Sequence, residues 1–253
     1  MKKLFVDLLL PSIITAIFVL LMSASYKADS LITNSRNEYL SAMSENTKIA
    51  STTLIIDAGH GGADGGALSI SGEKESILNL KISNKTELFA AFFGVSTITT
   101  RDSEEINYND SAITIHDKKI DDSNRRVNII NSVDDAVLIS IHQNFYNESN
   151  VSGAQIFYKA CADSKALSEN INTFFKHFAS KVRTPCQISD SIYLFKKINC
   201  PAVLVECGFI SNFNENLQLN ENNYQNKIAM AIISGYLQYE NRLYNTVGGI
   251  YES

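Results

Sequence analysis

The sequence predicts an α/β fold with a mostly parallel central sheet flanked by helices. Three short apolar runs, Leu54–Ile56, Asp135–His142 and Pro201–Cys207, are typical of buried strands. Segments whose apolar residues recur at helical spacing separate these runs along the chain. Because strands that alternate with helices build mostly parallel sheets, this order favours α/β layers.

The composition is that of a globular chain long enough to bury a core. Of the 253 residues, 45% are hydrophobic and 19% are charged, and the formal net charge is −5. No stripe of Lys and Arg runs through the sequence. This argues against a nucleic acid partner, because phosphate neutralisation needs clustered positive charge.

The cysteines show no CxxC spacing, which argues against a zinc ribbon or a thioredoxin-type site. We expect buried free thiols, and one disulfide remains an alternative if the domain is exported. The four positions are Cys161, Cys186, Cys200 and Cys207.

The N-terminal segment has the pattern of an export signal. Lys2 and Lys3 precede an uncharged apolar run over 8–22, and small residues follow it. Positive charge before the run predicts that everything after it lies outside the cytoplasm, with contact to the membrane if the segment is retained. A buried N-terminal helix is the alternative. We expect a signal peptide or N-terminal membrane anchor over 1–25, a polar linker over 26–50, the main folded domain over 51–240 and a tail over 241–253.

The first strand ends in a glycine-rich loop that contains His60, in the stretch TLIIDAGHGGADGGA. Glycines let such a loop fold tightly beneath a ligand. Apolar residues from Ile77 to Phe93 then recur at helical spacing, and Gly94 would end that helix. Val95–Thr99 follows as a second strand, which completes a βαβ unit.

The remaining elements follow from the same patterns. In chain order we expect a polar surface loop over 101–125 that covers the site, a helix starting over 126–132, a strand over 135–142, a strand over 153–159, a helix over 164–182, a short strand over 191–195, a strand over 201–207 and a helix over 224–240.

Three strands end in residues that can carry chemistry: His60, His142 and Glu206. Parallel strands deliver their carboxyl ends to one edge of the sheet, and Glu73 or Glu75 at the start of the first helix would overhang that edge. Two imidazoles and a carboxylate are a catalytic zinc set, with the fourth position open to water. A further carboxylate, Glu206, can then take and return a proton.

Each of these residues has a commoner explanation when it is taken alone. A strand-terminal His is more often hydrogen bonded or exposed than a ligand, and the helix-start glutamates could simply complement the helix dipole. Glu206 is harder to dismiss, because burying a carboxylate without a partner is costly. Their joint position at one edge favours a metal site. A phosphate loop is disfavoured, because no GK[ST] follows the glycines.

Four motifs in order resemble the type-3 zinc-dependent N-acetylmuramoyl-L-alanine amidases: IDAGHGGADGGA, SGEKESILNLKI, SIHQN followed by SGAQIFY, and PAVLVECGFISN. The resemblance covers roughly residues 53–240. It implies a phosphorylase/hydrolase-like three-layer fold, and a peptidoglycan substrate cleaved between the lactyl group of muramic acid and L-alanine.

The resemblance also implies roles for single residues. His60, Glu75 and His142 fall on the ligands of one zinc ion, and Glu206 falls on the catalytic glutamate. Glu75 is preferred to Glu73 because apolar residues follow it at plus three, plus five and plus seven. Arg126 falls on an arginine of the family, structural or on the substrate side; Arg126 and Asn144 are the candidate substrate-binding residues.

Within the family, the short chain without wall-binding repeats is most similar to the sporulation amidases of the CwlD type, which make cortex muramic-δ-lactam. Some similar spore amidases depend on an accessory protein. Two alternatives stay open: another zinc peptidoglycan hydrolase or deacetylase, and a partner-dependent, intrinsically inactive wall-binding protein.

Overall fold

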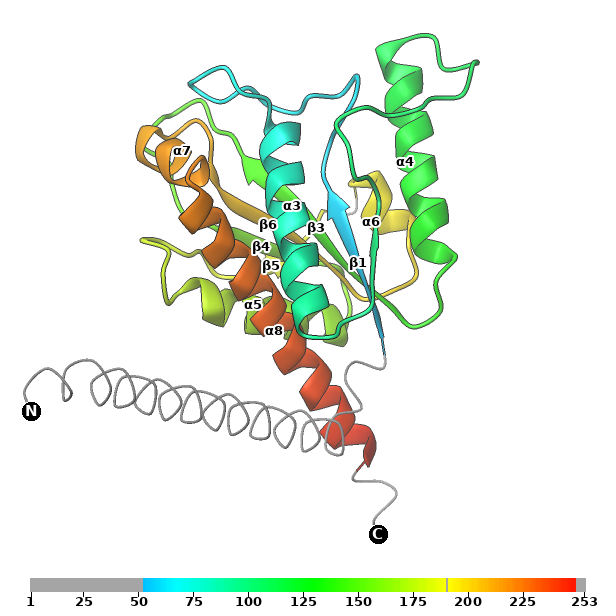
Figure 1. Ribbon diagram of the computed structural model, residues 1–253, viewed down its shortest axis with the longest axis vertical. Helices are drawn as coiled ribbons and strands as arrows, with labels where there is room; N and C mark the ends of the chain where they lie inside the picture. Colours follow the sequence, from blue (N-terminus) through cyan, green and yellow to red (C-terminus); the bar gives the residue numbers. More distant parts are fainter. Residues whose placement is uncertain (1–51, 190, 249–253) are drawn as a thin grey trace, which may run out of the picture. The chain divides into compact units, whose positions relative to one another are not determined.

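A six-stranded sheet forms the centre of the computed structural model, which describes residues 52–189 and 191–248 (Figure 1). The strands are β1 (Thr53–Ala58), β2 (Thr97–Thr99), β3 (Ala136–Asn144), β4 (Gln155–Tyr158), β5 (Cys186–Gln187) and β6 (Ala202–Phe209). Their order across the sheet is β2-β1-β3-β6-β4-β5. The neighbours β2, β1, β3 and β6 run parallel to one another, whereas β4 pairs antiparallel with β6.

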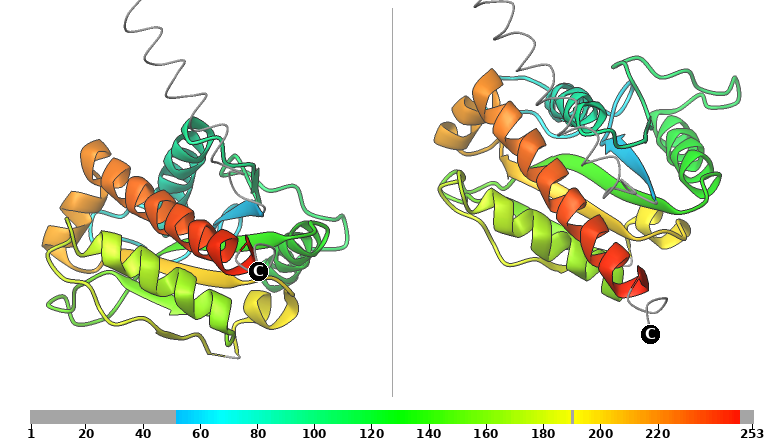
Figure 2. Two further views of the ribbon diagram at one scale, coloured as in Figure 1. Left: turned by 90° about the horizontal axis from the view of Figure 1, so that it is seen from below. Right: turned by 60° about the horizontal axis from the view of Figure 1, so that its bottom comes forward.

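Helices cover both faces of the sheet, as the two views in Figure 2 show. They are α3 (Glu75–Phe92), α4 (Ile115–Asn131), α5 (Ala162–Phe175), α6 (Tyr193–Lys197), α7 (Phe213–Leu219) and α8 (Asn222–Gly248). The core on one face joins the sheet to α3, α5 and α8, and the core on the other face joins it to α4 and α6. This three-layer arrangement with a mostly parallel sheet confirms the expected fold class.

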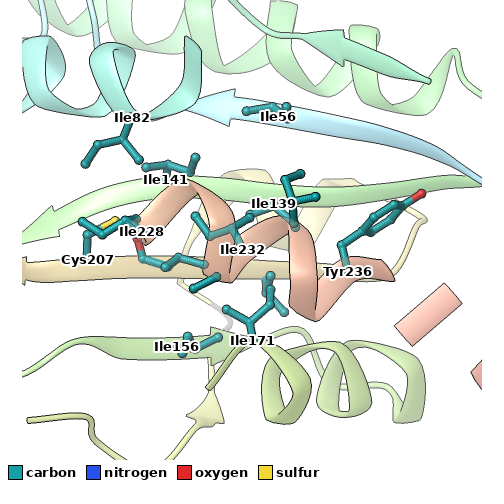
Figure 3. Packing of buried hydrophobic residues seen from close by; sticks show 14 of the residues in the cluster. Ile56, Ile82, Ile139, Ile141, Ile156, Ile171, Cys207, Ile228, Ile232 and Tyr236 are labelled. Carbon is teal, nitrogen blue, oxygen red and sulfur yellow. Dashed lines mark hydrogen bonds between the residues drawn. The ribbon is translucent and has the colours of Figure 1, made fainter. Parts of the chain in front are cut away.

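Alternation along the central strands explains why they are apolar throughout. Leu54 and Ile56 belong to the core under α3, α5 and α8, whereas Ile55 between them belongs to the opposite core. A strand covered on both faces needs apolar side chains at successive positions. Figure 3 shows the larger core, where Ile232 and Tyr236 of α8 lie among the side chains of the sheet.

Two elements differ from the sequence-based expectation on the α4 and α6 face. Residues 191–195 are not a strand, since α6 is a helix from Tyr193 to Lys197. A short apolar run does not by itself distinguish helix from strand. The helix expected to start over 126–132 begins at Ile115 instead, so much of the expected surface loop over 101–125 is helical.

The true start of α4 is marked by a capping box. The Thr114 side chain accepts a hydrogen bond from the backbone N–H of Asp117, and the Asp117 carboxylate accepts one from the Thr114 N–H. A T-x-x-D pattern is a local variant of the usual S/T-x-x-E signal. It places His116 in the first turn of α4 rather than in a loop.

Smaller differences concern the second half of the chain. α5 ends at Phe175, before the expected limit at 182, while α7 and β5 had no predicted counterpart. α8 runs to Gly248 and so continues into the segment 241–253. Of the cysteines, Cys207 is buried, but Cys161 and Cys186 are exposed, contrary to the expectation of buried thiols.

The expected signal or anchor over 1–25 and the linker over 26–50 lie outside the described residues. Within the described ranges, no helix combines the length and the apolar character needed to cross a membrane.

Candidate metal centre

The structure brings His60, Glu75, His142 and Glu206 together at the carboxyl edge of the sheet. His60 follows β1, and the glycine-rich loop then leads into α3, whose first residue is Glu75 (Figure 1). His142 in β3 and Glu206 in β6 are register partners on neighbouring parallel strands. Register partners project from the same face of a sheet, so both side chains point toward the α4 and α6 side.

The glycine-rich loop places His60 through an unusual backbone conformation. His60 has a φ of 60°, in the left-handed region that non-glycine residues seldom occupy. Gly59 makes room for the neighbouring ligand, because a Cβ there would lie 2.2 Å from the His142 ring. Gly66, with a φ of +68°, makes room for Glu75, whose Oε2 would lie 2.6 Å from an added Cβ. The glycines therefore allow the ligands to approach one another.

The Glu75 carboxylate lies between the two imidazoles. Its Oε2 is 3.3 Å from His60 Nε2, and its Oε1 is 3.1 Å from His142 Nδ1. The Gln143 N–H also donates to Oε1, at 3.1 Å. Burial raises the pKa of Glu75, but the imidazoles outweigh it and hold this pKa well below its ordinary value. Glu73 lies apart from the group, in an ion pair with Lys81 at 2.6 Å.

Glu206 contributes a second carboxylate, which, unlike that of Glu75, has one oxygen without a hydrogen-bond partner in the described part of the chain. Its Oε2 is shielded from solvent and has no hydrogen-bond partner among the described residues. Burial raises the pKa of Glu206 to about 7; the charge of His142 opposes the shift, and that of Glu75 adds to it. Cys207, the next residue, is buried on the opposite face of β6, as alternation predicts.

Asp64 is a site residue that the sequence analysis missed. Its Oδ2 lies 3.0 Å from His60 Nδ1, and Lys119 Nζ lies 2.9 Å from its Oδ1. Burial lowers the pKa of His60, but Asp64 and Glu75 outweigh burial and raise this pKa to about 9. Asp64 thus fixes the ring through the nitrogen that faces away from Glu75. The available signal was its place in the glycine-rich loop, four residues after His60.

Two buried arginines hold the turn after β1 in place. Arg126 pairs with Asp57 and donates to the backbone oxygens of Ala58 and His60, at 2.7 and 2.6 Å. Arg101 donates to the Ala58 and Gly59 oxygens, at 2.9 and 3.1 Å. Much of the donor capacity of Arg126 is therefore used inside the protein, although the residue also lines the cavity described next.

A cavity of about 400 Å³ opens over the two imidazoles and Glu206. One wall comes from α4 and includes Lys118, Lys119 and Arg126; the other comes from α6 and the residue before it, with Ile192 and Leu194. Asn144 does not belong to the lining; its backbone oxygen accepts a hydrogen bond from Ile210 at the end of β3.

The donor set fits a zinc ion. His60, Glu75 and His142 each offer a ligand atom, and these atoms lie within 4.8 Å of one another. Two imidazoles and one carboxylate match the ligand chemistry of catalytic zinc sites. The bond between Asp64 and His60 is the kind of outer contact that orients a ligating imidazole. Glu206, with its unpartnered oxygen, is a carboxylate beside the set rather than within it.

Comparison with known proteins gives a consistent family match. The model of the family described as N-acetylmuramoyl-L-alanine amidase matches residues 54–238. The germination-specific N-acetylmuramoyl-L-alanine amidase of Bacillus subtilis is 30% identical over 189 residues, which cover 74% of this chain and 78% of that protein.

Solved structures show the same fold. The CwlD amidase from Clostridioides difficile, in complex with the GerS lipoprotein, superposes with a TM-score of 0.71 at 36% identity, covering 75% of this chain and 98% of that one. The catalytic domain of CwlV, an N-acetylmuramoyl-L-alanine amidase from Bacillus (Paenibacillus) polymyxa, gives a TM-score of 0.64 at 25% identity, with coverage of 75% and 98%.

Proposed function

Because the chain belongs to the N-acetylmuramoyl-L-alanine amidase family, we propose that His60, Glu75 and His142 hold one zinc ion for its reaction. That reaction is hydrolysis of the amide between N-acetylmuramic acid and L-alanine in peptidoglycan. The observation that carries the proposal is the Glu75 carboxylate between two imidazoles, beside a second carboxylate with an unpartnered oxygen.

The residues around the proposed ligands have separate roles in this reaction. A bound zinc ion polarises a carbonyl and makes a water molecule more acidic. In this proposal Glu206 takes a proton from the attacking water and delivers it to the nitrogen of the departing L-alanine. Gly59 and Gly66 allow the ligands to meet, and Asp64 orients His60. Arg126 holds the backbone oxygen of His60, which makes it a positioning residue in this scheme.

Zinc content tests the ligand assignment directly. We expect about one zinc per chain in the wild type and a large loss in His60→Ala, Glu75→Ala and His142→Ala. Glu73→Ala is the matched control, because Glu73 lies two residues from Glu75 but pairs with Lys81. Equal zinc loss in Glu73→Ala and Glu75→Ala would contradict the assignment.

Turnover and product mass test the chemistry. We expect Glu206→Gln to keep its zinc and to lose at least about 100-fold in kcat, as is typical when a general base is removed. Mass spectrometry of digested wall should show a free lactyl carboxyl group on intact glycan. Loss of acetyl groups instead would indicate a deacetylase. Binding of zinc and wall without hydrolysis, even with a partner present, would favour a wall-binding protein.

We also propose a role in maturation of the spore cortex, on the outer side of the membrane, where peptidoglycan lies. The support is the similarity to a germination-specific amidase and to the CwlD amidase. Since that CwlD structure contains the GerS lipoprotein, an accessory protein for this chain belongs to the same proposal. Expression in a spore former that lacks its own germination amidase should restore muramic-δ-lactam, measured in digests of spore peptidoglycan.

A further inference from the structure

The cationic side chains that line the cavity differ in whether a carboxylate is paired with them. Lys119 is paired with Asp64 at 2.9 Å, and Arg126 is paired with Asp57 and, at 2.8 Å, with Asp122. Lys118 also lines the cavity, but no carboxylate among residues 52–189 and 191–248 lies within 4.0 Å of its ammonium. Its charge is therefore available to a ligand.

Neighbouring residues restrict the position of the Lys118 side chain. The half-buried side chain starts in the second turn of α4, and its Nζ lies 5.4 Å from the centre of the Tyr108 ring. Tyr108 is itself held, because its hydroxyl accepts a hydrogen bond of 2.8 Å from the Ala63 N–H in the glycine-rich loop. A cation over an aromatic ring is weakly attracted and keeps its other faces free.

The acidic residues of the cavity do not cancel this charge. Asp57 pairs with Arg126 and Asp64 with Lys119, and Asp122 pairs with the two arginines of α4 at positions 125 and 126. Glu206 is a register partner of His142 and belongs to the metal end of the cavity. An acidic ligand that enters along α4 therefore meets one uncompensated ammonium, in a cavity that also reaches both imidazoles.

We propose that Lys118 forms a carboxylate-binding subsite that favours peptides with a free carboxylate close to the scissile amide. This inference rests on the proposed function and names the substrate class of the same site, an acidic peptide. An ammonium and a carboxylate in a partly enclosed cavity form a charge-assisted hydrogen bond that is stronger than an exposed ion pair. Ile192 and Leu194 on the opposite wall offer apolar contact to the uncharged part of the peptide.

A pair of soluble substrates tests the subsite. Both are muramoyl-L-alanyl peptides with the same second residue, which carries a free carboxylate in one and a neutral carboxamide in the other. We expect the zinc-loaded wild type to show a kcat/KM about five- to tenfold higher for the carboxylate form. In Lys118→Gln this ratio should fall to about one, and Lys118→Arg should restore much of it.

Lys85→Gln is the matched control, because Lys85 is also half-buried but lies on α3, outside the cavity. Its ratio should equal that of the wild type. A wild type that cleaves both substrates equally, or a ratio unaffected by Lys118→Gln, would overturn the subsite.

Calorimetry measures binding of the two peptides, one with the free carboxylate and one with the carboxamide, and it does not depend on turnover. It therefore separates failure of the Lys118 subsite from failure of the proposed amidase function. We expect the peptide with the carboxylate to bind the wild type about five- to tenfold more tightly, and Lys118→Gln to abolish the difference. If neither substrate is cleaved but this preference is present, the amidase proposal fails and the subsite stands. Equal binding of both peptides would reject the subsite.

Discussion

At the scale of single residues, Asp64 determines how His60 can serve as a ligand. Its carboxylate lies 3.0 Å from Nδ1, so the hydrogen of the neutral imidazole belongs on that nitrogen and Nε2 faces Glu75. Lys119 holds Asp64 from the other side at 2.9 Å. Orientation through such an outer carboxylate reduces the freedom that His60 would lose on binding a metal.

Asp64→Asn should therefore weaken zinc binding while leaving all proposed ligands in place. The amide keeps the size of the side chain but loses the charge that holds the Nδ1 hydrogen. We expect zinc affinity to fall about 10- to 100-fold, measured by competition with a chromophoric chelator. Asp110→Asn, in an exposed position, is the control. An unchanged affinity in Asp64→Asn would show that the bond does not orient the ligand.

At the scale of elements, α4 supplies much of what surrounds the metal centre. It carries Arg126, which holds the turn after β1, and both lysines of the cavity wall. Most residues of α4 are polar, so its start depends on the capping box of Thr114 and Asp117 more than on apolar packing. The cap satisfies backbone N–H groups that the first turn would otherwise leave without partners.

Thr114→Ala should lower the free energy of unfolding by about 1 kcal/mol, since an N-cap side chain typically contributes that much. Urea denaturation followed by circular dichroism measures the effect. Thr173→Ala in α5 is a matched control, because Thr173 is exposed within a helix and, among the described residues, its side chain donates a hydrogen bond only to the Glu169 carbonyl. The control should change stability by less than about 0.5 kcal/mol, since alanine favours helices. Equal effects in both variants would exclude a special role for the cap.

At the scale of the whole molecule, Asp57 joins the central sheet to α4. It is 1% exposed and accepts hydrogen bonds from Ser140 of β3 and from Thr100, both at 2.6 Å, and it pairs with Arg126. Burial alone would raise the pKa of Asp57, but Arg126 and the two hydroxyls outweigh it and lower the pKa from 3.8 to about 2. The ionised form therefore stabilises the folded state.

This shift predicts a defined acid sensitivity. Because the folded pKa is lower than the unfolded one, the stabilisation is complete above about pH 4 and is lost as the pH falls toward 2. At about 1.4 kcal/mol per pKa unit, Asp57 contributes about 2.5 kcal/mol, of which about 1 kcal/mol is lost by pH 3. Denaturant unfolding at pH 6 and pH 3 measures this.

Asp57→Asn isolates the contribution. At pH 6 we expect it to lower the free energy of unfolding by about 3 kcal/mol, because Arg126 loses a buried partner. At pH 3 the difference in the free energy of unfolding between Asp57→Asn and the wild type should be smaller by about 1 kcal/mol, because Asp57 of the unfolded wild-type chain takes up its proton there while the folded form stays mostly ionised. The exposed Asp134→Asn should show no such narrowing. A constant gap between pH 6 and pH 3 would show that Asp57 does not titrate as expected.

The sequence by itself determined the layered fold, the three central strands and the helix that ends before Gly94. These features depend on burial, and burial leaves a pattern in neighbouring residues: β3 and β6 are apolar on both faces, and α3 ends before Gly94. The rule that parallel strands end at one edge was enough to group His60, His142 and Glu206. The structure brings these residues together with Glu75.

Only the tertiary structure decided the contacts made by loops and by short or polar elements. The bond between Asp64 and His60 depends on the left-handed turn at His60, and the helix at 193–197 depends on packing against the sheet. Lys118 differs from the other cations of the cavity because Asp64 of the glycine-rich loop pairs with Lys119 and Asp57 of β1 pairs with Arg126. These two pairs join residues far apart in the chain, so no local periodicity records them; the folded arrangement alone pairs Lys119 and leaves Lys118 available.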